Sequence, residues 1–129
     1  MVKQSIGQPK IIITWEQITD AVKKLSEMIP ENSVIYGIPR NGTIISCFLS
    51  HQRPDLQVVF ENPCDYYAEK EPNSFIVIDD IHDTGNTINV FWPRRMATLF
   101  WREKEEDNCP DWFVETIKND SWLVFPWEK

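Results

Sequence analysis

Long apolar runs are absent from this sequence. No stretch approaches the roughly 20 consecutive apolar residues that a helix needs to cross a bilayer. The first seven residues, MVKQSIG, also lack the apolar core of a signal peptide. Both absences argue against a membrane-bound or secreted chain, so we expect a cytoplasmic protein with no membrane partner.

Cysteine is scarce and shows no metal-binding pattern. The three cysteines, Cys47, Cys64 and Cys109, are widely spaced, form no CxxC pair and have no histidine at a zinc-binding spacing. We therefore expect free, buried thiols.

Positive charge is also in the minority. The chain has 13 lysines and arginines against 20 acidic residues, which gives a formal net charge of −7. This balance argues against non-specific nucleic-acid binding. An anionic ligand would need local groups to hold it, such as a metal ion, backbone amides and a few placed arginines.

The 129 residues, 42% of them hydrophobic, are enough to bury the core of one domain. Strand-like and helix-like segments alternate without repeat or linker, which predicts an α/β domain with a central, mainly parallel sheet flanked by helices. A capping box at Thr14, followed by apolar residues at helical spacing, predicts a first helix that stops at Pro30. Strands are expected over 11–14, 34–38, 56–60, 75–78 and 96–101, and further helices over 43–49 and 87–92.

Residues 75–87, FIVIDDIHDTGNT, are the most informative segment. The apolar run at its start is typical of a buried parallel strand, and open α/β sheets bind ligands where such strands end. Asp79 and Asp80 follow, with His82 expected as a loop residue, and the next turn offers threonine hydroxyls and backbone N–H groups that suit a phosphate. Carboxylates beside a phosphate cradle point to a sugar phosphate, a divalent metal and an enzyme.

Residues 77–87, VIDDIHDTGNT, resemble the phosphoribosyl pyrophosphate (PRPP) motif of the type I phosphoribosyltransferases. Within that family the chain most resembles the bacterial xanthine-guanine phosphoribosyltransferases. The resemblance implies the type I phosphoribosyltransferase fold over residues 1–129, with a small hood-like C-terminal segment from about residue 103 that binds the base. Further segments that support it, in the right order, are ITWE at 13–16, PRNG at 39–42, TLF at 98–100 and DSWLVFPWE at 120–128.

The implied reaction displaces pyrophosphate from PRPP by a purine nitrogen, with Mg²⁺. Asp79 and Asp80 are then expected to hold the ribose hydroxyls and the metal, with Asp80 nearer the metal, since carboxylates suit Mg²⁺. Asp83 is expected to act as a general base near purine N7. From the residues alone, solvated acids at a strand end and a plain turn stay open as alternatives. The 5′-phosphate is expected to lie against Thr84, Gly85, Asn86 and Thr87, which with Asp83 complete that side of the PRPP site.

Arg40, Asn41 and Gly42 would hold the pyrophosphate through backbone amides and the guanidinium group. An ordinary Pro-x-Gly turn is the alternative. From the family resemblance we also expect a cis peptide bond between Pro39 and Arg40.

For the base, the resemblance implies that Trp122 stacks on the purine and that the Leu123 backbone accepts hydrogen bonds from the base edge. The family's base-reading lysine is missing. Arg102 is the nearest cation and is expected to donate to a purine carbonyl, although its planar fork differs from an ammonium group. Core or interface packing is the alternative for Trp122 and the favoured role for Trp101, Trp112 and Trp127.

The segment at 61–74 is shorter than the loop with which the family closes over PRPP and excludes water. A short lid is compatible with slow chemistry, with a lid from a neighbouring subunit, or with binding without turnover. The leading interpretation is a purine phosphoribosyltransferase for guanine, xanthine or hypoxanthine that forms a homo-oligomer, either a dimer or a tetramer. The alternative is a PRPP- or nucleotide-binding regulatory protein, whereas the aromatic tail disfavours a non-purine base.

Overall fold

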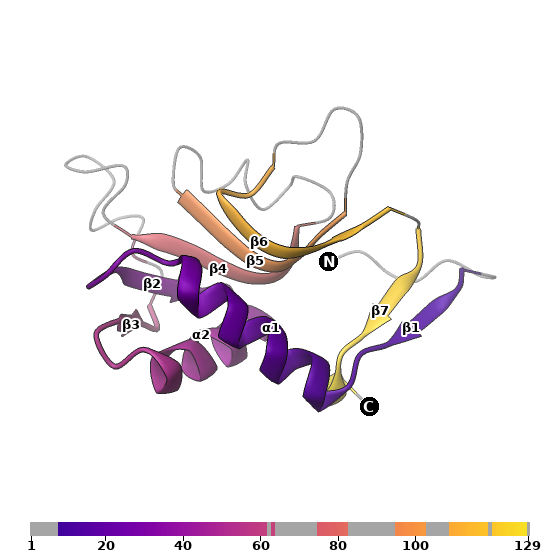
Figure 1. Cartoon of the computed structure of the whole chain (residues 1–129), viewed down its shortest axis with the longest axis horizontal. Helices are drawn as coiled ribbons and strands as arrows, with labels where there is room; N and C mark the ends of the chain where they lie inside the picture. Colours follow the sequence, from indigo (N-terminus) through magenta and orange to yellow (C-terminus); the bar gives the residue numbers. More distant parts are fainter. Residues whose placement is uncertain are drawn as a thin grey trace.

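A parallel sheet of five strands forms the centre of the described part of the chain, in the order β3-β2-β4-β5-β6 (Figure 1). The computed structural model describes residues 8–61, 63, 75–82, 95–102, 109–118 and 120–128. The strands are β2 (Val34–Gly37), β3 (Gln57–Val59), β4 (Ile76–His82), β5 (Arg95–Arg102) and β6 (Trp112–Ile117).

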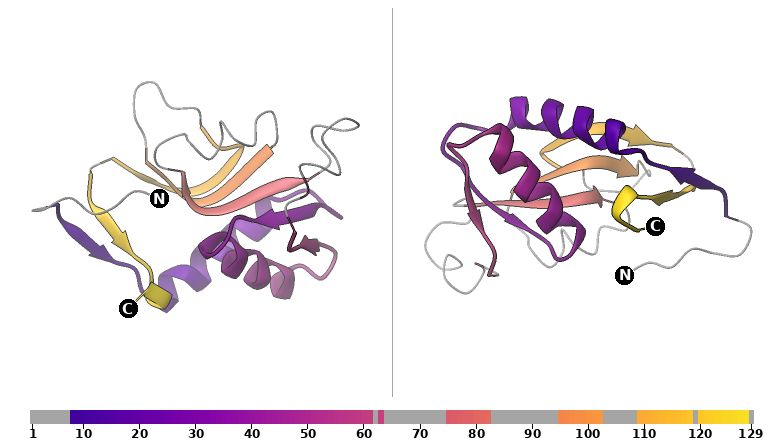
Figure 2. Two further views of the ribbon diagram at one scale, coloured as in Figure 1. Left: turned by 180° about the vertical axis from the view of Figure 1, so that it is seen from behind. Right: turned by 90° about the horizontal axis from the view of Figure 1, so that it is seen from below.

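Two helices, α1 (Trp15–Met28) and α2 (Asn41–Gln52), lie on the same face of this sheet (Figure 2). Helix α1 packs near β5 and β6, and α2 near β2 and β4. The predicted capping box starts α1: the Thr14 hydroxyl accepts from the Gln17 N–H at 3.1 Å, and the Gln17 side chain accepts from the Thr14 N–H at 2.8 Å.

The main core lies between the helices and the sheet. Ile18 and Leu25 of α1 and Ile45 of α2 meet the strand residues Ile76 and Ile78 there. Tyr36, Phe75 and Val77 form a smaller buried cluster. Ile76 and Ile78 belong to the main core and Val77 to the smaller cluster, so β4 is apolar and buried at each of these positions. This is typical of a central parallel strand.

A separate two-stranded parallel sheet joins β1 (Lys10–Ile12) to β7 (Trp122–Val124), with Ile11 opposite Leu123. A short 3₁₀ turn, η1 (Pro126–Glu128), follows β7. The C-terminal segment from about residue 103, which was expected to form a hood, therefore contributes to two sheets. Strand β6 extends the central sheet, whereas β7 pairs with the N-terminal strand β1. Figure 1 shows this pair to one side of the central sheet.

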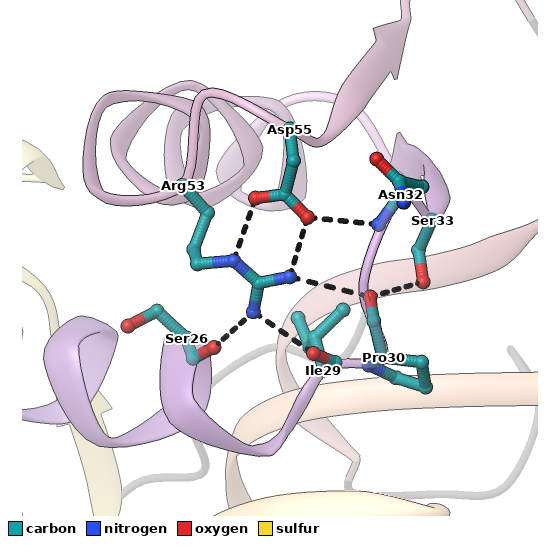
Figure 3. A network of polar contacts seen from close by, with 7 residues as sticks. All are labelled: Ser26, Ile29, Pro30, Asn32, Ser33, Arg53 and Asp55. Atoms are coloured by element: carbon teal, nitrogen blue, oxygen red, sulfur yellow. Dashed lines mark hydrogen bonds and ion pairs between the residues drawn. The ribbon is translucent and has the colours of Figure 1, made fainter.

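Arg53 and Asp55 form an ion pair next to the end of α1, near the residues where β2 and β3 begin (Figure 3). The guanidinium group donates to the carbonyl oxygens of Ser26 at 2.6 Å and Ile29 at 2.9 Å, which caps the end of α1. It also binds Asp55 through two hydrogen bonds of 2.7 Å, and Asp55 accepts from the Asn32 N–H at 2.8 Å. These hydrogen bonds lower the pKa of Asp55 below its ordinary value.

Several sequence predictions need correction. Strand β4 continues through His82, because pairing with β5 continues to the pair His82 and Trp101. Asp79, Asp80 and His82 are therefore strand residues, and His82 is buried instead of lying in a loop. Helix α2 extends beyond both ends of the predicted 43–49.

The cysteines differ in part from the expectation. Cys47 is a free thiol but only half-buried, and Cys109, which precedes β6, is exposed. Cys64 and the helix expected at 87–92 lie outside the described residues. Within the described ranges, neither helix combines the length and the apolar character that crossing a membrane requires.

Candidate functional site

The carboxyl ends of β2, β4 and β5 lie at one edge of the central sheet. The residues predicted to form a site come to this edge: residues 40–42 follow β2, Asp79 and Asp80 lie in β4, and Arg102 ends β5. Ligands of parallel α/β sheets bind at such an edge. Residues 40–42, Asp79, Asp80 and Arg102 therefore share one edge of the central sheet.

The connection from β2 to α2 has the features of an anion site. The Pro39–Arg40 peptide bond is cis, as predicted. Helix α2 starts at Asn41 with no side-chain cap and no acid in its first turn, so its first N–H groups are suited to an anion. Arg40 is exposed beside them.

Gly37 and Gly42 bring α2 close to the sheet. A Cβ atom on Gly42 would lie 2.3 Å from the carbonyl oxygen of Ile78, and one on Gly37 would lie 2.2 Å from the carbonyl oxygen of Gly42. The Ile38 N–H also donates to the same Ile78 oxygen at 2.9 Å. Glycine at both positions therefore sets the separation between the start of α2 and β4.

The two acids of β4 form a closely coupled pair. The Asp80 carboxylate accepts from the Asn41 side-chain amide at 2.7 Å through Oδ2 and from the Ile81 N–H at 2.8 Å through Oδ1. The Asp79 carboxylate accepts from the Asp80 N–H at 2.9 Å. Burial raises the pKa of Asp79 well above its ordinary value, and the charge and hydrogen bond of Asp80 raise it further. Ionisation of Asp79 beside the Asp80 carboxylate is therefore unfavourable in the free protein.

This pair fits a magnesium ion that is also held by substrate and water. A divalent cation would offset the burial and the charge of Asp80, which together raise the pKa of Asp79. The described residues hold no cluster of three or more His, Cys, Asp or Glu side chains suited to a metal. Mg²⁺ commonly binds one or two carboxylates together with substrate phosphates and waters, and that mode matches Asp79 and Asp80.

Trp127 is a site neighbour that the sequence analysis assigned to packing. Its indole Nε1–H donates to the Asn41 side-chain oxygen at 2.9 Å. Since Asn41 in turn donates to Asp80, one hydrogen-bonded chain joins η1, the start of α2 and β4. Trp127 and Asn41 are 86 positions apart, so no local sequence pattern could predict their contact.

The predicted base residues also come together. Arg102 is buried, and its Nη2 donates to the carbonyl oxygen of Ser121 at 2.7 Å. Ser121 directly precedes Trp122, which is half-buried in β7, and Leu123, which is buried. This hydrogen bond joins the end of β5 to the segment that carries Trp122 and Leu123.

A cavity of about 480 Å³ lies against the loop that precedes α2 and the first half of that helix. Arg40 lines it, whereas Asp79, Asp80 and Trp122 do not. Its lining residues are Pro39, Arg40, Thr43, Ile44, Cys47 and Phe48.

The remaining predicted site residues lie outside the described ranges. They are Asp83, Thr84, Gly85, Asn86 and Thr87. Most of the segment at 61–74 lies outside these ranges as well.

Known proteins resemble the chain over nearly its whole length, although no protein-family model matches it. The xanthine-guanine phosphoribosyltransferase of Idiomarina loihiensis is 25% identical, covering 92% of this chain and 87% of that protein. The purine phosphoribosyltransferase of Pyrococcus horikoshii has a TM-score of 0.69 at 27% identity, covering 93% of this chain and 94% of that one. A hypothetical protein of Neisseria gonorrhoeae with bound ppGpp has a TM-score of 0.70, covering 95% and 90%, and at 18% identity it shows the fold alone.

The sequence comparison and the structural comparison both give purine phosphoribosyltransferases as similar proteins. The parallel sheet and the covering helices match the purine phosphoribosyltransferase from Pyrococcus horikoshii. The chain has the type I phosphoribosyltransferase fold and resembles the bacterial xanthine-guanine phosphoribosyltransferases.

Proposed function

We propose that the chain is a Mg²⁺-dependent purine phosphoribosyltransferase. It transfers the 5-phosphoribosyl group from PRPP to a 6-oxopurine, releasing pyrophosphate and giving the nucleoside monophosphate in purine salvage. The observation that carries the proposal is the acid pair of β4, which lies beside the uncapped start of α2. Similarity to purine phosphoribosyltransferases over more than nine-tenths of the chain supports it.

The described residues divide the binding of PRPP between them. The first N–H groups of α2 and the Arg40 guanidinium would hold the pyrophosphate. The Asp79 and Asp80 carboxylates would accept hydrogen bonds from the ribose hydroxyls. Mg²⁺, when bound, would supply positive charge against the departing pyrophosphate.

Residues 83–87, which follow β4 in sequence, would supply the rest of the proposed PRPP site. Their assignment rests on the sequence resemblance at 83–87, where Asp83 would take the purine proton and the following residues would bind the 5′-phosphate. Because β4 ends at His82, the proposed general base, Asp83, follows the strand directly in sequence.

The base would be held by the segment around β7. We assign Trp122 to stacking on the purine and the Leu123 backbone to its edge. Arg102 would donate to the six-position carbonyl, and its hydrogen bond to Ser121 keeps it next to this segment. The homo-oligomer and the cytoplasmic location stay predictions.

A second candidate is a nucleotide-binding regulatory protein with the same fold and little turnover. It is favoured by one comparison, because the fold neighbour from Neisseria gonorrhoeae was solved with ppGpp bound. The short segment at 61–74 is also compatible with binding alone.

Incubation with PRPP, Mg²⁺ and each of guanine, xanthine, hypoxanthine and adenine separates the two candidates. We expect nucleotide from the 6-oxopurines and none from adenine, and we expect Asp83→Asn to lose most of the rate. Binding of PRPP without product from any base would support the regulatory candidate.

A further inference from the structure

We propose that Trp127 is a positioning residue for the cosubstrate site. Through the Asn41 amide, the turn η1 holds the Asp80 carboxylate in the orientation in which it meets PRPP. The inference rests on the proposed function, since it takes Asp80 to be a ligand of the ribose or its metal.

Trp127 determines which way the Asn41 amide points. An indole N–H only donates, so the Asn41 atom that faces it at 2.9 Å must be the carbonyl oxygen. The amide nitrogen then faces the opposite partner, the Asp80 Oδ2 atom at 2.7 Å. A carboxylate only accepts, so the two contacts are consistent with one amide orientation and not with its flipped form.

Asp80 is held at both of its oxygens. Oδ2 accepts from Asn41 and Oδ1 accepts from the Ile81 N–H, and the residue is only 8% exposed. Rotation of the carboxylate would break a hydrogen bond to a charged group away from bulk water, where such bonds are strong. Asp80 is therefore fixed before PRPP arrives, which removes a reorganisation step from binding.

Trp127 can serve as a support because the turn that carries it is itself fixed. Its ring stacks on Phe125 at 5.2 Å with an interplanar angle of 6°, and it meets the ring of Trp15 edge-on at 6.0 Å. Glu128 closes the turn, because its N–H donates to the Phe125 carbonyl and its carboxylate accepts from the Phe125 N–H. The indole donor is thus held in place independently of Asn41.

This arrangement links the proposed purine-binding segment to the proposed PRPP-binding residues. The segment that carries Trp122, assigned to the purine, also carries Trp127, which supports Asp80. A change at Trp127 should therefore affect PRPP binding without any direct contact with PRPP.

The test measures PRPP binding by calorimetry in the presence of Mg²⁺. Trp127→Phe keeps an aromatic ring but removes the donor, and we expect PRPP to bind about threefold to tenfold more weakly. Asn41→Ala removes both hydrogen bonds, including the one to the charged group, and should weaken binding by about tenfold or more. The double variant should match Asn41→Ala, because the Trp127 hydrogen bond acts only through Asn41.

Trp112→Phe is the matched control. It makes the same indole-to-phenyl change at the start of β6, where the Trp112 ring packs against Arg95, and it leaves the contacts of Trp127 intact. We expect its PRPP affinity to equal that of the wild type. In steady-state assays, Trp127→Phe should raise the KM for PRPP and leave the KM for the base unchanged, whereas general loosening of the fold would raise both.

The indole N–H resonance of Trp127 gives a readout that needs no variant at Trp127. We expect it to shift when PRPP and Mg²⁺ bind to the wild type, and this response should be lost in Asn41→Ala. Wild-type affinity in Trp127→Phe, or additive effects in the double variant, would overturn the positioning role while leaving the proposed function standing. A wild type that does not bind PRPP would overturn the proposed function itself, and the positioning role with it.

Discussion

Replacement of Gly42 by alanine tests how α2 is held against β4. The new Cβ would lie 2.3 Å from the Ile78 carbonyl oxygen, with Gly37 backbone 3.2 Å away on another side. Non-bonded heavy atoms pack at about 3.5 Å, so the backbones would have to separate by roughly 1 Å. Overpacking of this kind costs about 1–3 kcal/mol. In a free helix the same change would instead stabilise by about 0.8–1 kcal/mol, so the sign of the effect is diagnostic.

Thermal and denaturant unfolding measure this effect. At about 3–6 °C per kcal/mol for a domain of this size, Gly42→Ala should lower Tm by about 3–18 °C. Ser50→Ala, in the same helix, is the control; its hydroxyl bonds only to the Cys47 carbonyl, and its effect should stay within about 0.5 kcal/mol. A Gly42→Ala protein at least as stable as the wild type would refute the close approach of α2 to β4.

Three further predictions concern charge. Arg53→Met should lower stability by about 1–2 kcal/mol, since it uncaps the end of α1 and leaves Asp55 unpaired, with the exposure of the pair limiting the loss. The lowered pKa of Asp55 stabilises the fold above its unfolded pKa of about 3.9, and this contribution is lost as pH falls below that value. Unfolding at pH 7 and pH 3 should therefore show a smaller acid loss in Asp55→Asn than in the wild type. Asp79 behaves oppositely: its raised pKa reduces stability as pH rises above about 3.9. Asp79→Asn should raise Tm at pH 7 without ligand but weaken PRPP binding, and a variant destabilised at pH 7 would contradict the cost that burial and the Asp80 charge place on ionised Asp79.

The central strand illustrates what local sequence reveals and what it leaves out. The apolar run before Asp79 predicted a buried parallel strand correctly. The strand nevertheless continues through two acids to His82, because its length is set by pairing with β5, and β5 is distant in sequence. Polar residues locally predict the end of a strand, but pairing with a neighbouring strand can extend it past them.

The site shows the same division. The cis bond before Arg40 was predicted from the family resemblance, and the structure has it. The partners of Asn41 were not predicted, because Asp80 and Trp127 come from other parts of the chain and reach it only after the sheet and the tail are packed. Likewise, the strand at β1 was expected, but its pairing with β7 depends on where the two ends of the chain meet.

The transfer reaction itself gives the most direct test of the proposed function. Purified protein, PRPP, Mg²⁺ and guanine are incubated, and nucleoside monophosphate and pyrophosphate are quantified in the same samples. The proposed function predicts the two products in equal amounts, with formation dependent on Mg²⁺ and lost in an Asp79→Asn, Asp80→Asn double variant. Binding of PRPP with neither product formed, from guanine or from xanthine and hypoxanthine in its place, would contradict it.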